Sequence, residues 1–354
     1  MLISLLKYHL FGGEAPTLPN SKETWADLLI LSKKHGVTAL VYDALEAYFK
    51  ANPAPKPPRE TLAQLATHSS TIESDNKRRE LALIHFSKRL FGEKGIKTTV
   101  IKGSSLARLY PNPLHRECGD NDIYLGSHAA TADHWVMSLE IKVDTKDPRH
   151  SSFVFENAEF ENHAYLLYPT RVGDTTDEPD WQTTPWPKQE ALCRLIPEQE
   201  ALFLASHLEH HAMFFDEELA LGKILDWALL LQSGELDYHA FNQIKKGTAI
   251  DRFADLLTQY CVATFAIPAP DGYNPLSQPT FLAFPTLFLS PHPRHKAALV
   301  RVWRRGGRYL RYNKEYKEIF GESPFARFYL RNVLQALKQL VTFQHRESRS
   351  ESLR

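Results

Sequence analysis

Apolar residues recur at helical intervals through the first 95 residues of the chain. The segment "TWADLLILSKKHG" and the following "VTALVYDALEAYFKA" both show this spacing, which is typical of helices with one buried face. The proline-rich stretch "NPAPKPPRE" interrupts the pattern, since proline ends helices. One long helical pattern then covers residues 60–95. We therefore expect an N-terminal helical region over residues 1–95.

The pattern changes from helical spacing to short apolar runs at Ile96. The runs "IKTTVIKG" and "DNDIYLG" are β-branched or apolar and predict strands. Between them, "SSLARLY" predicts a helix with Ser104 as its N-cap. Further strands are expected at "IKVD" and on both sides of Asn157, whereas the proline-rich, acidic residues 169–190 predict a loop. This places a strand-containing core at residues 96–190.

Helical spacing returns after Pro197 and predicts a C-terminal helical domain over residues 191–354. The segments "IPEQEALFLASHLEHHAMF" and "ELALGKILDWALLLQSG" are the clearest helices in it, and proline suits the first turn of a helix. More helices are expected at 238–265, 293–318 and 324–345. The many prolines of residues 266–292 predict a long connection.

Composition narrows the class of protein without indicating a partner. The chain has 354 residues, 43% of them hydrophobic and 24% charged, with a formal net charge of zero, as in ordinary soluble globular proteins. Its three cysteines form no C-x-x-C pair, which argues against a disulfide framework and favours a reducing, cytoplasmic location. No apolar run reaches the roughly 18 residues that span a bilayer, so we expect no membrane partner.

Two aspartates on the second predicted strand indicate the chemistry. Asp120 and Asp122 are two positions apart, so their side chains lie on one face of a strand. Paired carboxylates bind cations or have raised pKa values, and such oxygen ligands suit Mg²⁺. Gly103, between the first strand and the helix, lets a ligand approach the backbone N–H groups of the helix start. This combination predicts phosphoryl or nucleotidyl transfer; taken singly, the two features are a solvated strand end and a turn.

The order of these residues resembles the nucleotidyltransferase superfamily, and within it a branch of mostly uncharacterised bacterial nucleotidyltransferases. The matching positions are Lys102-Gly103, Tyr110-Pro111, Arg116, Gly119-Asp120-Asn121-Asp122, Glu161 with His163, Leu204 with His207 and His211, and Asp226. The resemblance covers most of residues 20–235. It implies an α+β fold, in which a small mixed-sheet core is flanked by N-terminal and C-terminal helical regions.

The resemblance also implies an activity. It is the transfer of a nucleoside monophosphate from an NTP to an acceptor hydroxyl, with release of pyrophosphate and dependence on Mg²⁺ or Mn²⁺. Asp120, Asp122 and Glu161 are then the catalytic, metal-binding carboxylates, and Glu161 orients or deprotonates the attacking hydroxyl. Glu159 is the rival third carboxylate, because it shares the strand face of Glu161.

Six further residues are implied in binding the nucleotide: Lys102, Gly103, Ser104, Arg116, His163 and His207. Gly103 and Ser104 would cradle the triphosphate, and Lys102 or Arg116 would offset its charge. For Arg116 the alternative is a surface ion pair. The cluster of His207, His210 and His211 has two alternatives to a place near the triphosphate, namely a zinc site and plain packing.

The acceptor stays open between a small molecule, an RNA and a protein. The C-terminal 64 residues carry 15 Lys and Arg against 5 Asp and Glu. Within them, Arg301–Lys317 combines basic and aromatic residues, which predicts either contact with a polyanion or a solvated helix face. The alternative to an enzyme is a catalytically inactive module that binds a nucleotide, RNA or a protein. Asn121, where the family has an apolar residue, favours this alternative, and the intact carboxylate set opposes it.

Overall fold

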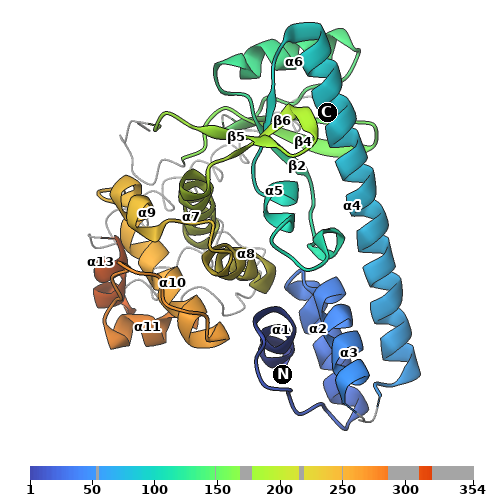
Figure 1. Ribbon diagram of the computed structural model, residues 1–354, viewed down its shortest axis with the longest axis vertical. Coiled ribbons are helices and arrows are strands. Elements are labelled where there is room, and N and C mark those ends of the chain that lie inside the picture. The colour runs from blue at the N-terminus through green and yellow to red at the C-terminus, as the bar shows by residue number, and fades with distance from the viewer. Residues whose placement is uncertain are drawn as a thin grey trace, which may run out of the picture.

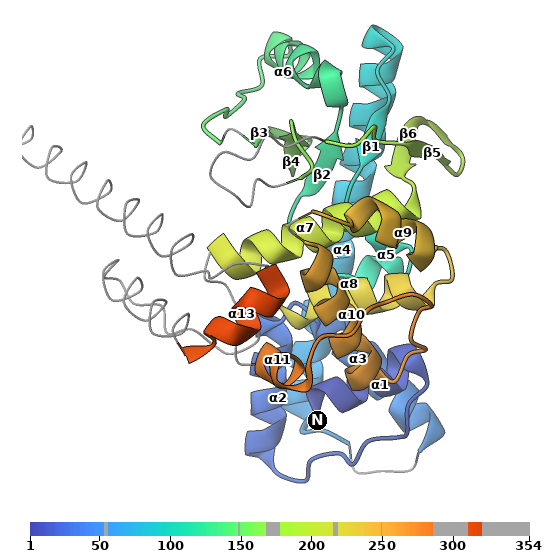
Figure 2. The same cartoon turned by 90° about the vertical axis from the view of Figure 1, so that its left-hand side faces the viewer.

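A six-stranded mixed sheet lies in the upper part of the molecule as drawn in Figures 1 and 2, with helices on both sides of it and most of the helices below it. The computed structural model describes residues 1–52, 56–147, 149–167, 178–214, 219–248, 250–285 and 311–320. Its strands lie in the order β3 (His150–Phe155), β4 (Ala158–His163), β2 (Asn121–Tyr124), β1 (Thr98–Val100), β6 (Gln189–Leu195) and β5 (Thr183–Trp186). The expected α+β fold is confirmed.

Pairing in the sheet is parallel where it joins distant segments and antiparallel elsewhere. β1 pairs in parallel with β6, and β2 with β4. The strands β3 and β4 form an antiparallel hairpin, and its two turn residues Glu156 and Asn157 have φ of 48° and 60°. Positive φ at both positions matches the right-handed twist of the strands.

The loop expected at residues 169–190 is wrong for its last part, because β5 and the start of β6 lie there. Pro185 is compatible with a strand since β5 is the edge of the sheet, where a missing N–H costs no ladder bond. The strand expected at "IKVD" is also wrong. Only Asp144 pairs, through an isolated bridge to Ser152.

The helices before the sheet and between its strands follow the expected pattern closely. They are α1 (Leu2–Phe11), α2 (Lys22–Lys34), α3 (Thr38–Ala51), α4 (Arg59–Lys94), α5 (Gly103–Ala107) and α6 (Ala129–Ser138), with short 3₁₀ turns η1 (Pro113–His115) and η2 (Gly126–His128). The expected N-cap Ser104 is wrong by two positions, because Lys102 occupies the cap of α5.

After the sheet, the residues that the structure describes are mostly helical. The elements are α7 (Pro197–Phe214), α8 (Leu221–Gln232), α9 (Tyr238–Lys245), α10 (Asp251–Phe265), α11 (Gln278–Phe284) and α13 (Asn313–Phe320). α11 lies inside the connection that the prolines of residues 266–292 predict. The predicted helix at 324–345 and most of the one at 293–318 fall outside the described residues.

Two hydrophobic clusters determine what covers the sheet. Phe86 of α4 is fully buried and packs its ring against Trp135 of α6 and Phe153 and Phe160 of the sheet. On the opposite side, Phe203 of α7 packs with Leu195 of β6 and with Ile101 and Leu166, which lie just after β1 and β4. The helix α7 thus lies between the sheet and the helices α8 and α10 (Figures 1 and 2).

A larger helical cluster joins residues from both ends of the chain. It contains Leu5 and Leu6 of α1, Leu225 of α8, and Phe284 of α11. The division at residues 95 and 190 therefore stays a prediction, and the apolar packing runs across it.

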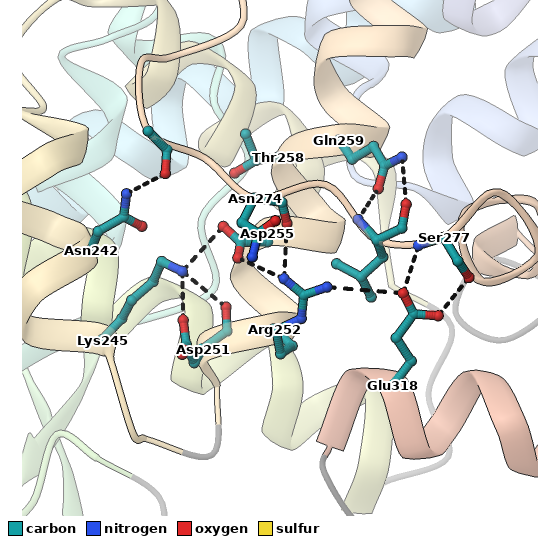
Figure 3. A network of polar contacts seen from close by, with 12 residues as sticks. Asn242, Lys245, Asp251, Arg252, Asp255, Thr258, Gln259, Asn274, Ser277 and Glu318 are labelled. Carbon is teal, nitrogen blue, oxygen red and sulfur yellow. Dashed lines mark hydrogen bonds and ion pairs between the residues drawn. The ribbon is translucent and has the colours of Figure 1, made fainter.

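Polar contacts fix the last described helix (Figure 3). Glu318 of α13 accepts a hydrogen bond from the Ser277 N–H at 2.6 Å. Nearby, the ammonium of buried Lys245 lies 2.6 Å from Asp251 and 3.1 Å from Asp255.

Among the described helices, none is both long enough and apolar enough to cross a membrane.

Candidate active site

The turn between β1 and α5 brings Lys102 and Gly103 beside Asp120 and Asp122. Lys102 and Gly103 have φ of 52° and 38°, a region that glycine adopts without strain. The carbonyl of Lys102 accepts the N–H groups of Ser105 and Leu106, so α5 begins at Gly103. The hydroxyl of Ser105 donates to Glu200 of α7, which ties the short helix α5 to α7.

Asp122 and Glu161 lie side by side on the parallel strands β2 and β4. Their backbones are direct partners in the register, so both side chains are on one face of the sheet. Nε2 of His163, two positions after Glu161, is 2.9 Å from Oδ1 of Asp122 and 3.5 Å from Oε2 of Glu161. These three residues each offer a ligand atom within 4.8 Å of the others, the one group of this kind found in the described residues.

The donor set fits a divalent cation held by the two carboxylates. Carboxylate oxygens are the ligands that hard divalent cations take in proteins. His163 is 1% exposed, and its Nδ1 has no hydrogen-bond partner in the described structure. A metal-bound imidazole normally donates a hydrogen bond through its second nitrogen. The geometry therefore favours His163 as the N–H donor that holds the two carboxylates together.

The surroundings of the two aspartates shift their pKa values in opposite directions. Burial by itself raises the pKa of Asp122, but the Lys102 ammonium and the hydrogen bond from His163 outweigh it and hold the pKa below its usual range. The pKa of Asp120 is raised to about 6, first by burial and then by the charge of Asp122. The hydrogen bond from His163 lowers the pKa of Glu161. Asp122 and Glu161 are thus both ionised at neutral pH, as cation ligands must be.

Asp120 lies directly before β2 and is not part of the group formed by Asp122, Glu161 and His163. It is near enough for the charges of Asp122 and Glu161 to raise its pKa. Glu159, the rival third carboxylate, is exposed on β4 and is also outside the group. The structure therefore brings Glu161, rather than Glu159, to Asp122.

Lys102 and His207 meet beside this cluster. The Lys102 ammonium is 2.8 Å from Oδ1 of Asp122 and 3.5 Å from Nε2 of His207. Burial and the neighbouring positive charge of Lys102 hold the pKa of His207 well below its usual value, so its imidazole is neutral. His210 instead meets the guanidinium of Arg149 at 2.8 Å. The alternative of a zinc site on this helix finds no support among the described residues.

Arg116 forms a buried ion pair. Its Nε and Nη2 donate to the two carboxylate oxygens of Asp226 at 2.7 and 2.8 Å, and the hydroxyl of Tyr110 donates to the same carboxylate at 2.7 Å. Both partners are largely shielded from solvent. The positive charge of Arg116 is therefore already offset by Asp226.

A cavity of about 230 Å³ opens beside Asp120 and Asp122. Its walls come from the segment before β2, from Leu204 and His207 of α7, from the start of α8, and from Gly36 between α2 and α3. Protein ligand sites commonly form at such junctions between parts of a fold.

His150 is a site residue that our sequence reasoning did not identify. It opens β3 opposite His163 in the hairpin, and its Nε2 is 3.7 Å from Oε2 of Glu161. The signal was present in the sequence, because an antiparallel hairpin turning at Glu156 and Asn157 places residue 150 across from residue 163.

Asn121 is accommodated without disturbing the strand. It is buried, its side-chain amide donates to the carbonyl of Arg79 at 3.2 Å, and the pairing of β2 with β4 is unbroken. A buried amide needs such a partner. The feature that favoured an inactive module therefore has a structural explanation that leaves Asp122 and Glu161 in place.

Comparison with known proteins adds one finding. A family model described as an uncharacterised nucleotidyltransferase matches residues 21–266, more than two thirds of the chain. The matched range contains all six strands of the described sheet and also Asp120, Asp122 and Glu161. Neither the curated proteins nor the solved structures contain a match.

Proposed function

The chain belongs to the family of uncharacterised nucleotidyltransferases, and we propose that it transfers a nucleoside monophosphate from an NTP to an acceptor hydroxyl, releasing pyrophosphate. The observation that carries this proposal is the adjacency of Asp122 and Glu161 across β2 and β4. Mg²⁺ or Mn²⁺ bound there would supply positive charge to the attacking and leaving oxygens of the in-line displacement.

In this proposal the protein's own residues position the reactants. Asp122 and Glu161 hold the cation, with Nε2 of His163 donating to Asp122 at 2.9 Å and lying 3.5 Å from Glu161. Glu161 is the more accessible of the two carboxylates, and it orients the acceptor hydroxyl and accepts its proton. Asp120 borders the cavity and completes the acidic set.

Lys102 is the cation best placed for the triphosphate, because its ammonium already lies at the edge of the carboxylate pair. Next to this ammonium, the phosphates would contact the backbone of Gly103 and Ser104. α5 has only five residues, so its dipole is small and the ammonium supplies most of the attraction. Arg116 fixes the wall of the cavity through Asp226, and neutral His207 lines it.

The acceptor and the base of the NTP are left open by this geometry. A polyanionic acceptor bound at Arg301–Lys317 stays a prediction, since residues 301–310 lie outside the described structure. Charge reversal at Arg304, Arg305 and Arg308 tests it. If a polyanion binds there, its affinity should fall and the salt dependence of binding should become shallower.

The test of the function compares neighbouring carboxylates on one strand. The wild type, Glu161→Gln, Glu159→Gln and Asp122→Asn are each incubated with Mn²⁺, an α-labelled NTP and a cell lysate. We expect label transfer by the wild type and by Glu159→Gln, and its loss in Glu161→Gln and Asp122→Asn. Transfer that survives Glu161→Gln but not Glu159→Gln would make Glu159 the third carboxylate. No binding of any NTP by the wild type in calorimetry would refute the function.

A further inference from the structure

Asn76 of α4 is bonded to the segment that leads into Asp120. Its side-chain NH₂ donates to the carbonyls of Leu114 and Arg116 at 2.7 and 2.8 Å. Asn76 is a buried residue in the middle of a 36-residue helix. A buried amide that uses both of its donors on one loop fixes that loop's distance from the helix.

Arg79 extends the same contact by one helical turn. Its Nη1 donates to Oδ1 of Asn76 at 2.8 Å, and its Nε donates to the carbonyl of Gly119 at 3.0 Å. The backbone carbonyl of Arg79 accepts the side-chain amide of Asn121. Asp120 is therefore held on both sides, through the residue before it and the residue after it.

The helix that makes these contacts is anchored at both ends. Leu65, near its start, belongs to the large helical cluster, and Phe86 and Leu90, near its end, belong to the cluster against the sheet. Figure 1 shows α4 running past the sheet down to α2 and α3. A helix of this length spans roughly 54 Å. Its middle turns are thus a rigid reference for the segment at 114–121.

We propose that Asn76 and Arg79 are positioning residues, which hold the peptide segment that carries Asp120 and leads into Asp122, a carboxylate of the proposed metal site. The inference rests on the proposed function and extends it to residues that touch neither metal nor substrate. Removing a residue that orients metal-binding groups typically lowers metal affinity about 10–100-fold.

The chain offers a matched control residue next to Asn76 and Arg79. Arg78 is exposed and pairs with Asp75 within α4. Mn²⁺ is titrated into the wild type, Arg78→Ala, Arg79→Ala, Arg79→Lys and Asn76→Asp, and free Mn²⁺ is followed by its paramagnetic resonance signal. Asp122→Asn, which lacks one of the proposed metal-binding carboxylates, shows the Mn²⁺ binding expected when the site is lost. Hydrogen exchange of amides in residues 114–120 reports the loop itself, and circular dichroism confirms that each variant is folded.

We expect Arg79→Ala and Asn76→Asp to bind Mn²⁺ at least tenfold more weakly than Arg78→Ala, with faster exchange in residues 114–120. Arg79→Lys keeps the charge but not the planar Nε donor, so it should resemble Arg79→Ala. Folded variants of Asn76 and Arg79 with the Mn²⁺ affinity of Arg78→Ala would overturn the positioning role and leave the proposed function standing. Mn²⁺ binding that is equal in the wild type and Asp122→Asn would overturn both.

Discussion

The ion pair between Arg116 and Asp226 allows a sharp prediction about stability. The Asp226 side chain is 3% exposed and the Arg116 side chain 13%, so both charges have lost most of their hydration. Replacing Asp226 with leucine leaves the guanidinium buried without its counterion. Breaking a buried pair by removal of one partner costs about 3–5 kcal/mol, so we expect the free energy of unfolding to fall by about 4 kcal/mol.

The double variant Arg116→Met/Asp226→Leu separates charge from packing. Apolar replacement of both members of a buried pair is often neutral, and what remains is the lost hydrogen bond of the Tyr110 hydroxyl, about 1 kcal/mol. The double variant should therefore be more stable than Asp226→Leu alone.

Guanidinium-induced unfolding followed by circular dichroism measures these differences. Asp27→Ala, an exposed change on α2, serves as control and should stay within about 0.5 kcal/mol of the wild type. A loss below about 1 kcal/mol in Asp226→Leu would contradict the desolvation penalty on which this reasoning depends. So would a double variant less stable than the single one. Either result would return Arg116 to the candidates for phosphate binding.

Three further predictions concern other buried groups. Phe86→Ala should destabilise the protein by about 3–5 kcal/mol, measured by the same unfolding assay, whereas Leu81→Ala, on the exposed side of α4, should change it by about 0.5 kcal/mol or less. Lys245→Ala removes the nearer cation from buried Asp255, which keeps Arg252 at 3.5 Å and the hydroxyl of Tyr238, and should cost about 1.5–3 kcal/mol, with Lys246→Ala as the neutral control; equal stabilities would argue against the network. Because the pKa of His207 is lowered well below 6.5 on folding, the unfolded state binds its proton first as pH falls. Stability should therefore decline below about pH 6.5, and this decline should be shallower in His207→Gln; identical pH profiles would show that His207 does not contribute.

The sequence predicts those parts of the fold that depend on local patterns. The helices before Gly95 and the hairpin around Asn157 follow from periodicity and turn residues alone. By contrast, the sequence does not predict β6, because its partner β1 lies about 90 residues earlier and no local signal reports such a pairing. It does not predict α11 either, because this short helix lies in a proline-rich stretch and is held by buried residues such as Phe284.

The candidate site divides in the same way. Asp122 and Glu161 could be placed from the spacing of residues on strands and from a family resemblance. The bond of Arg116 to Asp226 and the bond of Asn76 to the segment before Asp120 join residues 110 and 40 positions apart, so only the folded chain reveals them. The three predicted metal carboxylates remain a prediction until a cation is bound.

The large helical cluster has a consequence for how the protein can be divided. The family match begins at residue 21 and ends at 266, yet α1 and α11 lie outside that range and contribute fully buried Leu5, Leu6 and Phe284. A fragment trimmed to the matched range would expose the apolar faces that these helices cover, and exposed faces of this kind promote aggregation. The boundary that sequence comparison draws is thus shorter than the helical cluster, and a fragment that holds Asp122 and Glu161 should keep α1 and α11 as well.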